Sequence, residues 1–351
     1  MAVYPEFVSP VVDPSVSVPI FLGAVAFVVV CFLLTTLIPL RRLNGRMAGP
    51  DPRLQAAIEA IGSGAWQPAA DLLAEAGTDW ERRTACTRAL AYSAVHDGDA
   101  WLTAWQAAAP DDPDAVMVAA SARVQQAWKL RGAQRAVATS QEQFDAFHRE
   151  LHAAREALAH AARVCPEDPT PLVDTIWTAL GLGYSKDEMR EVWIELDARA
   201  PHHFVAHCSA VQYYSRKWRG SRLEAEEFAA RAVHEAPRGR LMTLLPLIVW
   251  FEHEEEGDSA GRYGMPDAIA LVDAALEDVA ATAEGHPGLP VARHLLAYFL
   301  VRQHRYRAAL EQFRHVDGYT DAMPWRYRPW GKLSYRLHRA RAVWGALLTR
   351  R

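Results

Sequence analysis

Two pairs of histidines in this chain have the spacing of residues that can bind a metal ion from one face of a helix. His148 and His152 are four residues apart, and so are His203 and His207. Residues at this spacing leave a helix on the same side, so each pair could supply half of a zinc site. A complete site needs a third or fourth ligand, and the chain contains neither an HExxH nor a CxxC motif to provide it. We therefore interpret the four histidines as ordinary helix positions, and we expect no metal ion and no cofactor.

An acidic stretch, residues 252–264, is a second candidate for cation binding. Its sequence is EHEEEGDSAGRYG, and the carboxylates that could offer oxygen ligands are Glu252, Glu254, Glu255, Glu256 and Asp258. They lack the alternating spacing and the central glycine of an EF-hand loop. The stretch is therefore predicted to be a solvated loop. Residues 129–141, KLRGAQRAVATSQ, are also polar and are predicted to be a loop, before a helix from Glu142 to Val164.

Motifs that would indicate a nucleotide-dependent enzyme are absent from the chain. We find no GxxxxGK[ST], no GxGxxG and no set of protein-kinase motifs. Serine, histidine and aspartate all occur, but nothing in the sequence places them together. We therefore predict a protein that is not an enzyme. The alternative is an enzyme or a metal-dependent sensor that uses the histidine pairs or the acidic stretch.

The elements that carry these residues are predicted to be helices. From Leu54 onward Ala, Leu, Glu, Arg and Trp dominate, and apolar residues recur every three or four positions. Glycines and prolines divide the chain into segments of about 10–16 residues, a normal helix length. We therefore predict an all-α fold, with a repeat domain over residues 54–324 and a basic amphipathic helix over residues 325–351.

Prolines recur at a regular interval in the middle of the chain. Pro166, Pro201 and Pro237 are 35 and 36 residues apart. Each follows a stripe of small or apolar residues, and the stripes are Ala154, Leu158 and Ala161; Met189, Trp193 and Leu196; and Ala225, Ala229 and Ala232. This cadence resembles the tetratricopeptide (TPR) repeat, in which small residues let the second helix pack closely and a proline ends it. The first-helix signature of that repeat, W-x2-L-G-x2-Y, is not intact here. The resemblance implies a TPR-like α-solenoid.

Local strings extend this resemblance. They are PEDPTP at 166–171, GLG at 181–183, PHH at 201–203 with His207, and KWRGS at 217–221. Together they resemble an uncharacterised family of membrane-anchored TPR-like proteins from high-GC bacteria, over residues 115–255. The resemblance implies a fold and no particular activity. In TPR geometry Trp177, Gln212 and Arg216 would face a groove that binds peptide or helical segments of a protein partner. A position in the core is the alternative for Trp177, and plain solvation is the alternative for Gln212 and Arg216.

The C-terminal helix has an apolar stripe flanked by basic residues. The stripe consists of Leu333, Leu337, Ala340, Trp344 and Leu347, and the flanking residues are Lys332, Arg336 and Arg339. One interpretation is a capping helix that lays its stripe on the last repeat. A second is contact with an anionic membrane surface through the three basic residues. A third is nucleic-acid binding, which the acidic remainder of the chain disfavours.

An uncharged apolar run near the N-terminus decides where the chain is predicted to lie. Residues 19–40, PIFLGAVAFVVVCFLLTTLIPL, have 22 residues and no charge, which is enough to span a hydrocarbon core of about 30 Å. Residues 1–18 contain no Lys or Arg, whereas Arg41, Arg42 and Arg46 follow the run. The side rich in Lys and Arg stays in the cytoplasm. A cleaved signal peptide, the rival interpretation, would carry its basic residues before the run.

We therefore predict a single-pass protein of the cell membrane. Its parts are a short outer N-terminus (1–18), a transmembrane helix (19–40), a basic linker rich in Pro and Gly (41–53) and a cytoplasmic helical domain. The scattered cysteines agree with a reducing compartment. The predicted role is a membrane-tethered, non-catalytic scaffold that holds protein partners on its repeat surface.

Overall fold

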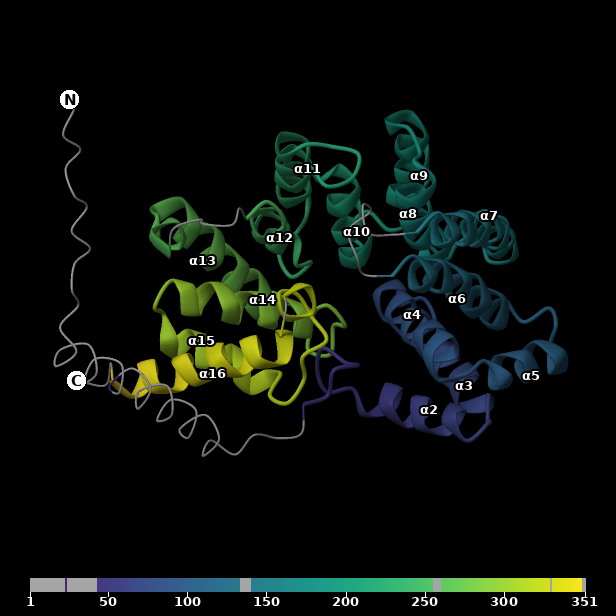
Figure 1. Ribbon diagram of the computed structural model, residues 1–351, viewed down its shortest axis with the longest axis horizontal. Helices are drawn as coiled ribbons and strands as arrows, with labels where there is room; N and C mark the ends of the chain where they lie inside the picture. The colour runs from purple at the N-terminus through teal and green to yellow at the C-terminus, as the bar shows by residue number, and fades with distance from the viewer. Residues whose placement is uncertain (1–22, 24–42, 133–139, 255–259, 329, 349–351) are drawn as a thin grey trace, which may run out of the picture.

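The computed structural model describes Gly23 and residues 43–132, 140–254, 260–328 and 330–348 (Figure 1). Its helices are α2 Pro52–Gly62, α3 Gln67–Ala76, α4 Trp80–Asp97, α5 Ala100–Ala108, α6 Pro113–Arg131, α7 Gln141–Val164, α8 Thr170–Leu182, α9 Lys186–Arg199, α10 Phe204–Tyr214, α11 Arg222–Glu235, α12 Leu245–Glu252, α13 Pro266–Ala281, α14 Leu289–Arg302, α15 Tyr306–His315 and α16 Gly331–Leu348. Short 3₁₀ helices are η2 Met242–Leu244, η3 Ala260–Gly264 and η4 Trp325–Tyr327. Within these described ranges there is no β-strand, and the only β-type pairing is one isolated bridge. The all-α prediction is therefore confirmed.

Successive helices pack against one another along most of the chain. The small-residue stripes face inward, as in α11, where Ala225, Ala229 and Ala232 are buried. Serines begin several helices because their hydroxyls accept backbone N–H groups that have no partner inside the helix. Ser140 and Ser185 do so at α7 and α9, each in a capping box. Local capping and inward-facing stripes therefore define the helical array.

Helix α14 forms the centre of the C-terminal half. Ten of its residues are buried, including the run from His294 to Val301. A helix that is apolar on every side must be covered on every side. Contacts with α13, α15, α16 and η3 provide this cover.

One glycine marks a close approach between helices. A Cβ atom at Gly181 of α8 would lie against the Leu151 side chain and 2.7 Å from Cζ of Phe147 on α7. We expect Gly181→Ala to destabilise the protein by about 1–3 kcal/mol, because the packed α7–α8 contact has no room for a methyl group. Gly62→Ala is the matched control, since no atom lies within 4 Å of a Cβ at the end of α2. Equal melting temperatures for the two variants would contradict this packing.

A buried ion network joins helices that are distant in the sequence. The guanidinium of Arg83 in α4 donates from Nε to Oδ2 of Asp168 at 2.7 Å and pairs through Nη2 with Asp114 of α6. Asp168 also accepts the backbone N–H of Thr170 at 2.8 Å, which fixes the start of α8. The side chain of Asp168 is 1% exposed. The network therefore holds α4, α6 and α8 in one arrangement.

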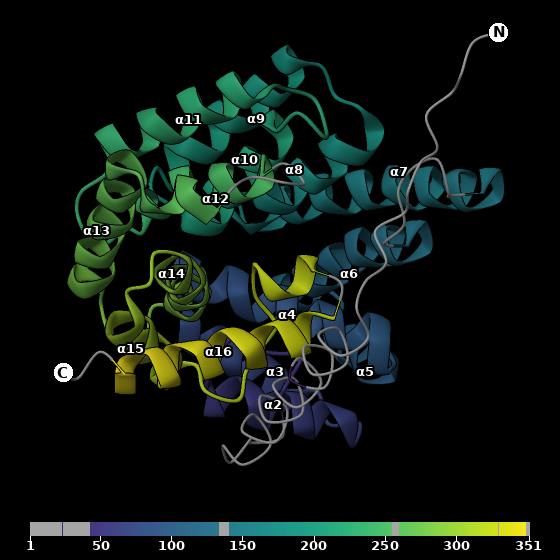
Figure 2. The same cartoon turned by 60° about the vertical axis from the view of Figure 1, so that its left-hand side comes forward.

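The two ends of the helical array meet. The segment 43–49, which we call the arm, runs beside residues 318–321: the N–H of Asn44 donates to the carbonyl of Gly318 at 2.7 Å, and the N–H of Thr320 donates to the carbonyl of Asn44 at 2.9 Å. Figures 1 and 2 show the purple arm next to the C-terminal helices. His294 of α14 adds a bond from Nε2 to the carbonyl of Ala48, at 2.7 Å. Residues 41–53 were predicted to be a linker from their composition. In the structure, residues 43–49 of this stretch pack against the far end of the chain.

The predicted outer N-terminus and transmembrane helix, residues 1–18 and 19–40, lie outside the described residues except for Gly23. Within the described part of the chain, no helix is both long enough and apolar enough to cross a bilayer.

Candidate binding pocket

A pocket of about 480 Å³ lies among α4, α6, α8, the arm and η4, and we call it the central pocket. Its aromatic lining residues are Tyr92 of α4, Trp128 of α6, Trp177 of α8 and Tyr327 of η4. The segment just before α16 that carries Tyr327 lies in the middle of the molecule (Figure 1). The pocket therefore exists only because the C-terminal end folds back over the first helices.

Three indoles cluster together, and two of them, Trp128 and Trp177, line the central pocket. The ring of Trp128 lies 5.7 Å from that of Trp177 and 5.5 Å from that of Trp218, and both contacts are edge-to-face. Arg131 lies 5.6 Å from the ring centroids of both Trp128 and Trp218. Arg88 lies 5.8 Å from the ring of Trp177. Indole faces bind cations and apolar groups well, so Trp128 and Trp177 give the pocket a stacking surface beside the positive charge of Arg88.

A buried carboxylate accompanies Arg88. Asp174 Oδ1 lies 3.6 Å from Nε of Arg88, and the Asp174 side chain is 3% exposed. Burial raises the pKa of Asp174, and the guanidinium of Arg88 opposes that rise. Asp174 therefore lies beside Arg88 on the buried side, while the guanidinium itself remains partly open to the pocket.

The three residues predicted to share a groove have different surroundings. Trp177 lines the central pocket and donates from Nε1 to Oγ of Ser209 at 3.0 Å. Gln212 is buried and donates from Nε2 to Oε1 of Glu252 at 2.7 Å. Arg216 is exposed after the end of α10, and its backbone N–H donates to Nε2 of His253 at 3.3 Å. Only Trp177 of the three lines this pocket; Gln212 contacts α12, and the backbone of Arg216 contacts the residue that follows α12.

The histidine pair in α10 serves the fold. His203 is the N-cap of α10 and contacts Oγ1 of Thr84 through Nε2, at 3.1 Å. The ring of His207 contacts the carbonyl of His203 at 2.9 Å and packs edge-to-face on Trp193. Burial lowers the pKa of both His203 and His207 to about 4, so both rings are neutral at pH 7.

The other pair, His148 and His152, is exposed on α7. The ring of His148 lies 5.5 Å from that of Phe147. Over the residues that the structure describes, no group of three or more His, Cys, Asp or Glu side chains is arranged to hold a metal ion.

The described part of the acidic stretch is engaged in ion pairs. Glu252 pairs with Lys217, and Glu254 Oε2 pairs with Arg328 at 2.7 Å. The phenol of Tyr263 donates to Glu254 at 2.5 Å. Residues 255–259 lie outside the described ranges. Glu252 and Glu254 therefore tie α12 to its surroundings.

The acidic stretch also contains a short match to a hydrolase motif. Residues 257–261 read GDSAG, which has the spacing of the GxSxG nucleophile turn. That turn follows a strand and opens a helix in the hydrolases that use it. Here the preceding element is α12 and the following one is the 3₁₀ helix η3. The described elements on either side are therefore not the strand and helix of that turn, and residues 257–259 themselves lie outside the described ranges.

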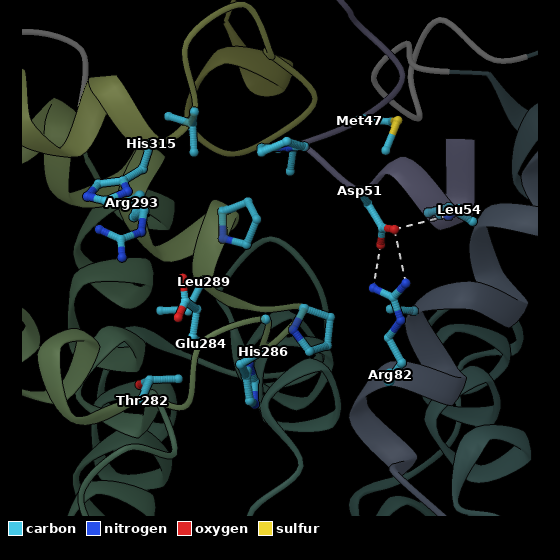
Figure 3. A pocket seen from close by; sticks show the side chains of 18 of the residues that line it. Met47, Asp51, Leu54, Arg82, Thr282, Glu284, His286, Leu289, Arg293 and His315 are labelled. Atoms are coloured by element: carbon cyan, nitrogen blue, oxygen red, sulfur yellow. Dashed lines mark hydrogen bonds and ion pairs between the residues drawn. The ribbon is translucent and has the colours of Figure 1, made fainter. Parts of the chain in front are cut away.

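A cavity of about 670 Å³ lies at the seam where the arm and α2 meet the α13–α14 turn (Figure 3). On one side Asp51 accepts the N–H of Leu54 at 3.0 Å and pairs with Arg82 through two oxygens. On the other side Arg293 and His315 lie next to each other (Figure 3), and Arg293 donates to Gln312 at 3.2 Å. Asp51, Arg82 and Arg293 are thus already paired, and we rank this cavity below the aromatic pocket as a candidate site.

The basic residues predicted to meet a membrane lie on α16, which begins at Gly331 rather than at residue 325. Lys332 is exposed and lies near Gly45 of the arm, Arg336 is half-buried, and Arg339 pairs with Asp317 at 2.8 Å. The face that α16 packs inward carries Tyr335, Ala342 and Ala346, together with Ala340 of the predicted stripe. The capping interpretation with the whole stripe inward is wrong, because the large members of that stripe point outward.

The fold and the pocket define an all-α helical array with an internal aromatic pocket. Comparisons with protein-family models, with curated proteins and with solved structures found no match.

Proposed function

We propose that this protein is a membrane-tethered, non-catalytic interaction module of the TPR-like α-solenoid type, and that its central pocket binds a peptide segment of a partner protein. The observation that carries the proposal is the wall of indoles beside the partly open guanidinium of Arg88. The cadence of prolines and small-residue stripes supports the TPR-like assignment, because those stripes form the buried faces of successive helices.

The lining of the central pocket suits a short peptide. A volume of about 480 Å³ falls in the range of roughly 300–1,000 Å³ that is usual for ligand pockets. An apolar side chain of the peptide would pack on Trp128 and Trp177. A carboxylate of the peptide would face Arg88 and Lys129, which both line the pocket. Tyr92 and Tyr327 are 41% and 49% exposed, and they would stack on the peptide at little cost in reorganisation.

The membrane tether is part of the proposal. The apolar run 19–40 would span the bilayer with the N-terminus outside and the helical domain in the cytoplasm. Confinement near the membrane raises the effective concentration of the module toward partners in the same membrane. A weak pocket of this size would then suffice for stable association.

The pocket can be tested by selection from a random peptide library displayed on phage, with the detergent-solubilised full-length chain as bait. We expect selected peptides to lose affinity about tenfold, or about 1.4 kcal/mol, in the double variant Tyr92→Ala and Tyr327→Ala. Ile194→Ala is the matched control, because Ile194 is exposed on α9 outside the pocket. Peptides that bind the double variant and the wild type equally would place binding elsewhere and refute the pocket assignment.

A further inference from the structure

The outward face of α16 exposes large apolar side chains in a row. Trp330, just before the helix, is 82% exposed, and Leu337 is 47% exposed. The exposed large side chains of this row, which we call the outer face, are Trp330, Leu333, Leu337, Trp344, Leu347 and Leu348. Within the helix, Leu333, Leu337, Trp344 and Leu347 are four, seven and three residues apart, which keeps these four on one side. A contiguous apolar face of this kind marks a surface that meets another apolar phase or a partner.

The charge around the outer face is positive. Residues 331–348 contain Lys332, Arg336, Arg339 and Arg341 and no Asp or Glu. Arg341 is exposed, and the neighbouring α15 adds the exposed Arg314. Basic residues that border an apolar stripe with tryptophans are typical of helices that lie in the interface of an anionic bilayer. Arg339 pairs with Asp317, so Lys332, Arg336 and Arg341 are the basic residues of α16 that border the apolar row without an ion pair to this chain among the described contacts.

The position of the arm brings α16 close to the end of the apolar run. That run ends at Leu40, and Leu43 is packed against the same buried cluster as Tyr335 of α16. Gly45 lies next to the Lys332 side chain. Three residues span at most about 10 Å, which is about one helix diameter. A bilayer that holds residues 19–40 must therefore have its surface near α16.

We propose that the outer face of α16 lies in the headgroup region of an anionic lipid bilayer. This inference rests on the proposed membrane tether. Tether and helix give two points of attachment, so they fix the orientation of the helical domain instead of leaving it on a flexible stalk. The orientation in turn sets the direction in which the central pocket faces. Lipid is the occupant that satisfies the apolar row, the surrounding cations and the nearby arm together.

The test uses the full-length chain in vesicles of phosphatidylcholine and phosphatidylglycerol at roughly 7:3. The photo-crosslinking residue p-benzoylphenylalanine replaces Leu337 on α16 or, as the matched control, Leu223 on α11, which is 62% exposed. Figures 1 and 2 both place α11 and α16 on opposite sides of the molecule. We expect lipid adducts at position 337 to exceed those at position 223 by about tenfold, and to decrease in pure phosphatidylcholine.

Extraction with alkaline carbonate separates the two proposals. A chain that resists extraction and forms lipid adducts at position 337 supports both the tether and the docked helix. A chain that resists extraction but forms equal adducts at positions 337 and 223, or crosslinks at 337 to a second copy of itself, refutes the docked helix and leaves the tether standing. A chain that carbonate releases refutes the tether, and the docked helix that rests on it.

Discussion

Replacing Arg83 with leucine is expected to destabilise the protein by about 3–5 kcal/mol, with a fall in melting temperature of about 10 °C. The guanidinium of Arg83 compensates Asp168 and Asp114, and its side chain is only 9% exposed. Removing it leaves a carboxylate in Asp168 that is 1% exposed and has lost its charge partner. An uncompensated buried charge costs far more than the ion pair contributes. Thermal unfolding followed by circular dichroism measures the effect.

Two further variants test whether charge burial causes this loss. Arg238→Leu removes an arginine whose pair with Glu277 is exposed, and we expect a change below about 0.5 kcal/mol. Adding Asp168→Asn and Asp114→Asn to Arg83→Leu removes the stranded charges while keeping side-chain groups that can accept hydrogen bonds. We expect this triple variant to recover much of the stability. If it melts as low as Arg83→Leu alone, lost packing rather than stranded charge is the cause.

The helices could be predicted from the sequence because their determinants are local. Periodic apolar residues, small-residue stripes and prolines all act within one or two turns. Helix α7 illustrates this. It begins at Gln141, one residue before the predicted start at Glu142, and its N-terminus is capped by Ser140 and Gln143, which are neighbours in the sequence.

The closure of the array could not be predicted in this way. Asn44 and Tyr319 form a bridge between segments without hydrophobic periodicity, and they are far apart in the chain. Arg83 and Asp168, which form a buried ion pair, are also far apart in the chain. From the sequence alone, a charged residue in a helix is predicted to be exposed to solvent unless its distant partner is known. The central pocket depends on closure, so TPR geometry alone could identify Trp177 but not the contribution of Tyr327.

Acidification is expected to destabilise the fold by several kcal/mol. Burial lowers the pKa of four histidines, which are His203, His207, His294 and His338, from 6.5 to about 4. The folded state therefore favours their neutral forms. Their contribution is fully present above pH 6.5 and is lost as pH falls toward 4. Each histidine changes the free energy of unfolding by about 1.4 kcal/mol per pH unit within this window. Over the whole window one histidine therefore contributes about 3 kcal/mol.

Glu81 acts in the opposite direction over an overlapping range. Burial raises its pKa from 4.5 to about 7, so the folded state favours the protonated acid. The stability from this group is fully present below pH 4.5 and is lost as pH rises through 7. Four histidines outweigh one glutamate, so the net loss on acidification equals about three groups, or about 4 kcal/mol per pH unit near pH 5. We expect maximal stability near pH 6.5 and a steep fall below it.

His294 makes this acid effect specific to the seam where the array closes. Its Nδ1 accepts the indole N–H of Trp325 at 3.0 Å, so its proton lies on Nε2 and is donated to the carbonyl of Ala48 at 2.7 Å. A second proton on Nδ1 would face the Trp325 N–H and break that bond. Glutamine at this position can accept and donate in the same sense without titrating. We expect His294→Gln to reduce the slope of stability against pH by about 1.4 kcal/mol per unit between roughly pH 5 and 6 in urea unfolding. His148→Gln, on the exposed face of α7, should leave the slope unchanged. An identical slope in wild type and His294→Gln would mean that the seam does not sense acid, because the histidine that bonds the arm to α14 would have been removed without effect.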